Sequence, residues 1–160
     1  MITITIQQEP FDVTSVIQVL VDGDDGIGAL CTFSGYVRGH QWRAEQGVAE
    51  MIAMELEHYP GMTEKAIRTI CDKACQRWPV KGIHVTHRVG RLVLSEPIVL
   101  VAVTTAHRQA SFEACHFVMD FLKVDAPFWK KEIYRYVDNH EQITRWVEQR
   151  STDVERQQQW

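Results

Sequence analysis

Residues 97–124 read PIVLVAVTTAHRQASFEACHFVMDFLKV, and this stretch decides the fold. Its first part, 97–105, is a nearly continuous apolar run of strand length, which is typical of a central strand covered on both faces. The following residues predict a long helix from Arg108 to Val124. That helix ends at Asp125-Ala126-Pro127, because proline disfavours helix in the residue before it. A buried strand followed directly by a long helix indicates a sheet with helices packed against it.

The other expected elements surround this unit. We expect strands at 2–6, 28–37, 51–58, 83–89, 128–137 and 143–148, a short helix capped by Asp12, and a long helix from Pro60-Gly61 to about Trp78. The long helices alternate with pairs of strands, which favours an α+β fold over a doubly wound parallel one. The prediction is one catalytic domain over residues 1–150, with a mixed or antiparallel sheet packed with two long helices. Polar residues 38–50 are expected to form a mobile loop, and 151–160 a solvated tail.

Composition excludes several classes of protein. The 160 residues suit one core, and a net charge of -4 argues against a general nucleic-acid binder. The longest apolar run, 98–103, is too short to span a membrane, and the first residues lack the pattern of a signal peptide. A cytoplasmic protein is therefore expected. The four cysteines lack metal or disulfide spacing, and His84 and His87 fall on opposite faces of a strand, so neither a metal nor a cofactor is predicted.

Two places could carry chemistry with an anion. His107 and Arg108 open the second long helix, where unpaired backbone N–H groups and the helix dipole favour a phosphate or carboxylate. The alternative is an ordinary strand–helix turn with a surface arginine. Arginines such as Arg38 and Arg145 are most often surface residues that form salt bridges.

The second place is KVDAPFWKK at 123–131. Lys123 ends the helix, and Lys130 follows the Pro127 corner on a strand that can fold back beside it. Lys123 alone is explained by the helix dipole. Two ammonium groups close together beside an apolar Phe128-Trp129 wall can instead lower each other's pKa and serve as acid, base or oxyanion partner. From the residues alone, the prediction ends at a small anionic ligand and lysine-assisted chemistry.

Several stretches together resemble one family, the large, catalytic subunit of molybdopterin synthase. They are FSGYVRGH (33–40), LEHYPGMTEKA (56–66), RWP (77–79), HRVG (87–90), TTAHR (104–108), FVMDFLKVDAPFWKKE (117–132) and RWVE (145–148). The resemblance implies a sulfurtransferase that converts cyclic pyranopterin monophosphate to molybdopterin. It takes sulfur from the C-terminal thiocarboxylate of a small ubiquitin-like subunit. It also implies a homodimer of this chain within a heterotetramer, and no metal or cofactor.

The resemblance also implies the roles of particular residues. Lys123 and Lys130 match the family's catalytic lysines, and the substrate-binding set comprises Tyr36, Val37, Arg38, His107, Arg108, Lys131, Glu132 and Arg145. Tyr36 stands where relatives often have lysine. A helix of sixteen residues separates His107 from Lys123 by roughly 24 Å, which a pterin monophosphate cannot bridge. We therefore expect His107 and Arg108 to complete the site of a second protomer.

Two other functions remain open at this point. One is a non-catalytic module that binds a ubiquitin-like tail or a phosphorylated ligand. The other is an acyl or phosphoryl transferase that uses the same anion site.

Overall fold

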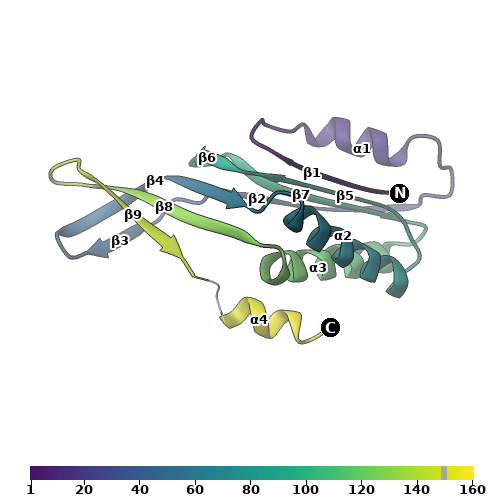
Figure 1. Ribbon diagram of the computed structural model, residues 1–160. Helices are drawn as coiled ribbons and strands as arrows, with labels where there is room; N and C mark the ends of the chain where they lie inside the picture. Colours follow the sequence, from purple (N-terminus) through teal and green to yellow (C-terminus); the bar gives the residue numbers. More distant parts are fainter. Residues whose placement is uncertain (149–150) are drawn as a thin grey trace.

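The computed structural model describes residues 1–148 and 151–160, and these residues form two β-sheets and four helices (Figure 1). The first sheet has the strand order β1-β5-β7-β2, with β1 parallel to β5 and the other pairs antiparallel. Its strands are β1 (Ile2–Gln7), β5 (Val80–Arg88), β7 (Pro97–Thr105) and β2 (Ala29–Tyr36). Strand β2 is an edge strand, because its only partner in this sheet is β7.

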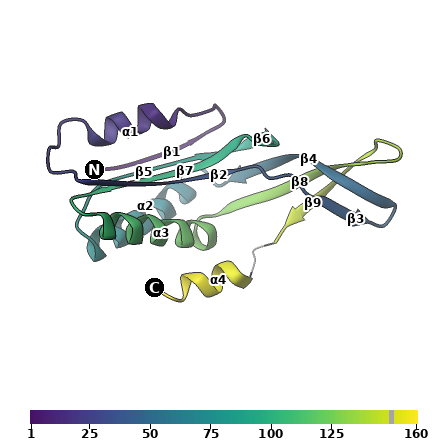
Figure 2. The same ribbon diagram turned by 180° about the vertical axis from the view of Figure 1, so that it is seen from behind.

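The second sheet is antiparallel and extends away from the helices (Figures 1 and 2). Its order is β3-β4-β8-β9, and β6 also pairs with β4. The strands are β3 (Gln41–Ala44), β4 (Gly47–His58), β6 (Gly90–Val93), β8 (Phe128–Tyr136) and β9 (Gln142–Val147). Strand β8 therefore leads from the end of the helical layer straight into this sheet.

The helices cover both faces of the first sheet (Figures 1 and 2). They are α1 (Val13–Val21), α2 (Met62–Arg77), α3 (Arg108–Asp125) and α4 (Ser151–Gln157). Helices α2 and α3 pack together on one face, α1 lies on the other, and α4 packs against α3. Asp12 caps α1 by accepting from two backbone N–H groups, as predicted. The predicted α+β architecture with two long helices is confirmed.

Strand β7 is central, as its apolar run predicts. Every residue from Val99 to Thr105 is buried. Val101 and Val103 belong to the core cluster that includes Phe117 and Val118 of α3. Burial of each such side chain contributes about 1.5–3 kcal/mol, so this strand–helix pair dominates the core. Because β7 leads directly into α3, the core also fixes where both ends of α3 lie.

The expected mobile loop at 38–50 is wrong. The segment contains β3, a tight turn and the start of β4, with Ala44 paired to Gly47 and Gly47 at a φ of 134°. It looks polar because Gln41 and Arg43 face solvent, whereas the alternate residues Trp42 and Ala44 turn inward. The ring of Trp42 lies 5.3 Å from that of Tyr134, a contact between segments far apart in the sequence.

The expected solvated tail at 151–160 is also wrong. Residues 151–157 form α4, and the Trp160 ring packs at 5.6–5.8 Å from the rings of Phe117 and Trp78. Strand β6 is not among the strands expected from the sequence. No helix in the described part of the chain is long and apolar enough to span a bilayer.

Candidate active site

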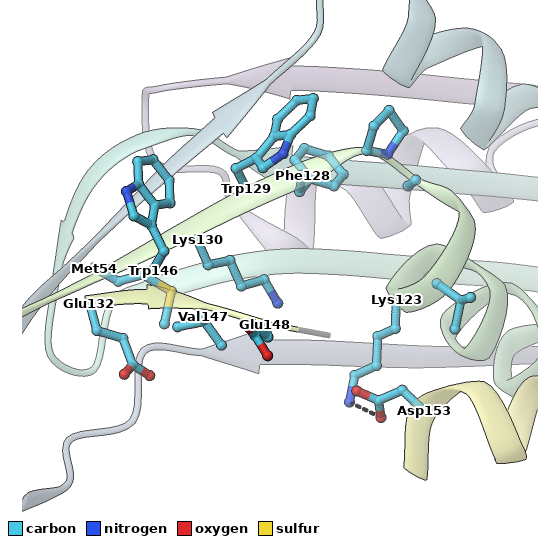
Figure 3. A pocket seen from close by; sticks show the side chains of 13 residues that line it. Met54, Lys123, Phe128, Trp129, Lys130, Glu132, Trp146, Val147, Glu148 and Asp153 are labelled. Atoms are coloured by element: carbon cyan, nitrogen blue, oxygen red, sulfur yellow. Dashed lines mark ion pairs between the residues drawn. The ribbon is translucent and has the colours of Figure 1, made fainter. Parts of the chain in front are cut away.

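Lys123 and Lys130 line one cavity of about 550 Å³. Lys123 projects from the last turn of α3 and Lys130 from β8, and the turn at 125–127 between them brings both ammonium groups to the same hollow (Figure 3). The end of α3, strands β8 and β9, and α4 form the walls. The described residues that line it include Met54, Val124, Phe128, Trp129, Glu132, Trp146, Val147, Glu148 and Asp153. Both predicted lysines therefore line the same cavity.

The apolar wall is fixed to the core through Phe128. Its ring stacks on His87 at 3.7 Å with an interplanar angle of 15°. Burial lowers the pKa of His87 to about 3, and its Nδ1 lies 2.8 Å from the carbonyl oxygen of Arg88. A neutral ring therefore supports Phe128 at neutral pH. Trp129, the next residue of the strand, also lines the cavity but is 48% exposed. Of the two aromatic residues of this wall, Phe128 is therefore the one fixed to the core.

Glu132 lies at the centre of a polar cluster at the far side of the cavity. Its carboxylate accepts hydrogen bonds from the hydroxyl of Tyr134 and, at 2.9 Å, from Nη2 of Arg145. The Nε2 of His40 lies 3.6 Å from the other carboxylate oxygen and 2.8 Å from the Tyr134 hydroxyl. The guanidinium of Arg145 also lies 5.2 Å over the Trp42 ring. We call Glu132, Tyr134, Arg145 and His40 the Glu132 cluster.

The Glu132 cluster joins three segments of the chain at the cavity wall. Glu132 is 6% exposed and Tyr134 is fully buried. Burial, and secondarily the neighbouring Glu132 carboxylate, raise the pKa of Tyr134. The two predicted substrate residues Glu132 and Arg145 are therefore paired with each other. The sequence predicted both of these residues near the site but did not predict Tyr134 or His40. The only hint of a role for His40 was its place at the end of the FSGYVRGH motif.

Of the eight predicted substrate-binding residues, only Glu132 is among the described residues that line the cavity. Lys131 points to the opposite face of β8, where it pairs with Glu55 at 3.0 Å. Tyr36 and Arg38 are exposed at the end of β2, and Val37 between them is 2% exposed. The Val37 N–H donates to the carbonyl oxygen of Glu96, which fixes the backbone of this segment.

His107 and Arg108 are exposed at the N-terminus of α3, at the opposite end of the helix from Lys123. His107 is the N-cap residue, but its side chain makes no capping hydrogen bond. The hydroxyls of Thr105 and Ser111 instead donate to the carbonyl oxygens of His107 and Arg108. Within one copy of the chain, these two residues and the lysines therefore do not meet.

A second hollow of about 320 Å³ lies between β2 and α3. Cys31, Phe33, Phe112, Cys115 and Met119 line it, and Lys123 lines both this hollow and the larger cavity. Phe33 is 40% exposed and Phe112 is 61% exposed. We call this surface the β2–α3 face. Burial raises the pKa of Cys115, so its thiol is not prepared as a nucleophile at neutral pH.

Two charged residues that line the cavity, Glu148 and Asp153, were not predicted as site residues. Asp153 of α4 lies 3.5 Å from the Nζ of Lys123, and Figure 3 shows this ion pair at the edge of the cavity.

Comparisons with known proteins identify the family of this chain. Residues 6–125 match the family model described as MoaE protein. The molybdopterin synthase catalytic subunit of Pseudomonas aeruginosa is 48% identical over 157 residues, covering 98% of this chain and 97% of that protein. The solved MoaE protein of Burkholderia ambifaria MC40-6 is 44% identical with a TM-score of 0.79, covering 100% and 98%. Molybdopterin synthase from Staphylococcus aureus is 28% identical with a TM-score of 0.75, covering 90% and 96%.

Proposed function

This chain belongs to the family of MoaE proteins, the catalytic subunits of molybdopterin synthase in molybdenum cofactor biosynthesis, and we propose the reaction that its cavity performs. The chain transfers sulfur to cyclic pyranopterin monophosphate from the C-terminal thiocarboxylate of a small ubiquitin-like subunit. The observation that carries this proposal is the convergence of Lys123 and Lys130 on one cavity of about 550 Å³. That volume is in the range that suits a small ligand.

The two lysines suit the charge that sulfur transfer develops. Attack by the thiocarboxylate places negative charge on oxygen or sulfur, and an ammonium group already in position stabilises it without reorganisation. Lys123 assists the transfer by protonating the leaving oxygen or by holding the thiocarboxylate. Lys130 shares substrate binding and charge stabilisation. The anchored Phe128 ring keeps one wall apolar, which strengthens these interactions by excluding water.

The sulfur carrier is the second subunit that the description "catalytic subunit" implies. Its tail must be extended and flexible to reach a hollow between α3, β8 and α4. We therefore propose a cytoplasmic heterotetramer with two copies of this chain at its centre and one small subunit at each end.

A second copy of this chain completes the cavity. The β2–α3 face carries an unpaired strand edge and two exposed phenylalanines, features that a symmetric dimer would bury. A twofold axis across α3 sets the helix antiparallel to its partner copy. The N-terminal end of one α3 then lies beside the C-terminal end of the other. In that arrangement the partner's cationic helix start, which carries His107 and Arg108, approaches Lys123, and Arg38 belongs to the same anion-binding surface.

An assay with two substrates tests the proposed reaction. The chain is incubated with thiocarboxylated small subunit and cyclic pyranopterin monophosphate, and the product is detected by its dithiolene sulfurs. Sulfur-bearing product is expected. Stable binding without product would instead indicate a non-catalytic binding module, and transfer of an acyl or phosphoryl group would indicate the other transferase.

Mixed dimers test the shared site. His107→Ala chains and Lys123→Ala chains are expected to be inactive as homodimers. The hybrid of the two retains one intact site of two, so about half of the wild-type activity should return. An inactive hybrid contradicts the shared site, because both chains would then carry a broken site of their own.

A further inference from the structure

Helix α4 is held on the helical layer by contacts at and just beyond its C-terminal end. The amide nitrogen of Gln157 donates to Asp125 at 2.7 Å, and the indole N–H of Trp160 donates to Asp120 at 2.8 Å. The guanidinium of Arg77 donates to the backbone oxygen of Trp160. Because the Trp160 ring also packs among Trp78, Phe117 and His116, the end of the chain has a fixed place on the helical layer.

This docking puts the carboxylate of Asp153 beside a proposed catalytic lysine. Its Oδ1 lies 3.5 Å from the Nζ of Lys123. The side chain of Asp153 is only 18% exposed, whereas that of Lys123 is 43% exposed. A pair in which the carboxylate is largely removed from water is less screened than an ordinary surface pair. Asp153 is therefore placed to hold the longer, more mobile side chain.

Lys123 needs such a partner because its side chain is flexible. Four rotatable bonds separate its ammonium group from α3, and ordering them costs conformational entropy. Among the described residues that line the cavity, the charged groups other than Lys123 and Asp153 are Lys130, Glu132 and Glu148. Each of these groups attracts or repels the ammonium group of Lys123 and so affects its distance from the reacting atoms. The Asp153 carboxylate, fixed on α4, holds the ammonium group in one position.

We propose that Asp153 is a positioning residue for Lys123 in the sulfur transfer. This inference rests on the proposed function and adds α4 to the active site. Asp153 acts through Lys123 and does not contact the reacting atoms. It keeps the ammonium group ordered at the mouth of the cavity, so that catalysis depends on a carboxylate from the last ten residues of the chain.

The first test compares kinetics of matched variants in the full complex. Asp153→Asn removes the charge, Asp153→Glu keeps it, and Glu155→Gln makes the same chemical change at an exposed position of the same helix. For Asp153→Asn we expect kcat to fall about fivefold with KM for the pyranopterin within twofold, a pattern that marks lost positioning. Asp153→Glu should recover most of the rate, and Glu155→Gln should match the wild type.

Three kinetic results would overturn the proposal. They are an unchanged kcat in Asp153→Asn, an equal loss in Asp153→Asn and Asp153→Glu, or a lower KM, which would mean that Asp153 only competes with the anionic substrate. If the wild-type complex makes no sulfur-bearing product, the proposed function fails instead.

The second test needs no turnover. The complex is treated with a limiting amount of an acetylating reagent, and modification of Lys123 and Lys130 is measured by mass spectrometry of their peptides. Loss of the ion pair should raise the modification of Lys123 about two- to threefold in Asp153→Asn relative to Glu155→Gln, with Lys130 unchanged. An unchanged Lys123 rate in Asp153→Asn overturns the proposal even if the enzyme is active.

Discussion

The Glu132 cluster should behave as one energetic unit, and a double-mutant cycle can measure this. Glu132→Gln keeps an oxygen that can accept from Tyr134 but removes the charge that faces Arg145 and His40. Tyr134→Phe removes the hydroxyl and keeps the ring packed on Trp42. The two substitutions therefore break the same network from opposite sides, with little change in volume.

The expected magnitudes follow from burial. A hydrogen bond to a charged group contributes about 1.5–3 kcal/mol when both partners are buried. Arg145 is 42% exposed and regains water when its partner is neutralised. We therefore place Glu132→Gln near the lower limit, at about 1.5 kcal/mol of lost unfolding free energy. Tyr134→Phe should also cost about 1.5 kcal/mol. Because Glu132→Gln weakens the Tyr134–Glu132 hydrogen bond that Tyr134→Phe removes, the double variant should lose about 1 kcal/mol less than the sum.

Urea unfolding of the four proteins measures the cycle. In thermal unfolding, each single variant should lower Tm by about 3–6 °C, given roughly 2–4 °C per kcal/mol for a domain of this size. Lys131→Gln, which breaks a partly exposed pair on the other face of β8, is the control and should change the unfolding free energy by less than about 0.5 kcal/mol. Strict additivity of Glu132→Gln and Tyr134→Phe would refute the reasoning, because it would mean that the cluster is a set of independent contacts.

Three further predictions follow from the same structure. Lys123→Ala should lower product formation at least about 100-fold while small-subunit affinity, measured by calorimetry, changes little; loss of affinity alone would make it a docking residue. Since burial lowers the pKa of His87 to about 3, the unfolded chain takes up a proton below about pH 6.5 while the folded chain does not. As the pH is lowered from 6.5 to 3, the unfolding free energy should therefore decrease by up to about 1.4 kcal/mol per pH unit. His87→Gln should flatten this slope in urea titrations at several pH values. An equal slope in the variant would contradict the prediction. Phe112→Asp should convert the dimer to monomer in light scattering, whereas Val19→Asp, equally exposed on α1, should not; a dimeric Phe112→Asp would argue against the β2–α3 face as the interface.

Elements with a local pattern could be predicted from the sequence. The apolar run of β7, the helical spacing of α2 and the Asp12 cap of α1 each depend on neighbours within a few turns of chain. Strand β3 could not be predicted in this way. Its inward residues, Trp42 and Ala44, become buried only when β8, about ninety residues later, supplies Tyr134. A strand with one solvated face and a partner distant in sequence has the composition of a loop.

The functional site likewise has some features that depend on local sequence and others that depend on contacts distant in sequence. The proximity of Lys123 and Lys130 could be predicted because only the Pro127 corner separates them, so local geometry decides their distance. The pairing of Glu132 with Arg145 depends on the register of β8 with β9, where these two residues are directly opposite. This register makes Glu132 and Arg145 an ion pair, although the family resemblance implies that each of them binds the substrate. Asp153 depends on the docking of α4, which no short-range pattern encodes.

The charge of the cavity supports the proposal that a second copy of the chain completes the site. Among the described residues that line it, two lysines face three carboxylates, Glu132, Glu148 and Asp153. Asp153 is paired with Lys123, and Glu132 with Arg145. Such a lining has little positive charge left over for a phosphate, which prefers cationic partners and helix N-termini. The chain has that combination at the start of α3, in a segment that its own cavity does not reach. In the proposed dimer, where two copies of α3 run antiparallel, a phosphorylated substrate would meet both sets of residues, and this is the arrangement that the mixed-dimer experiment tests.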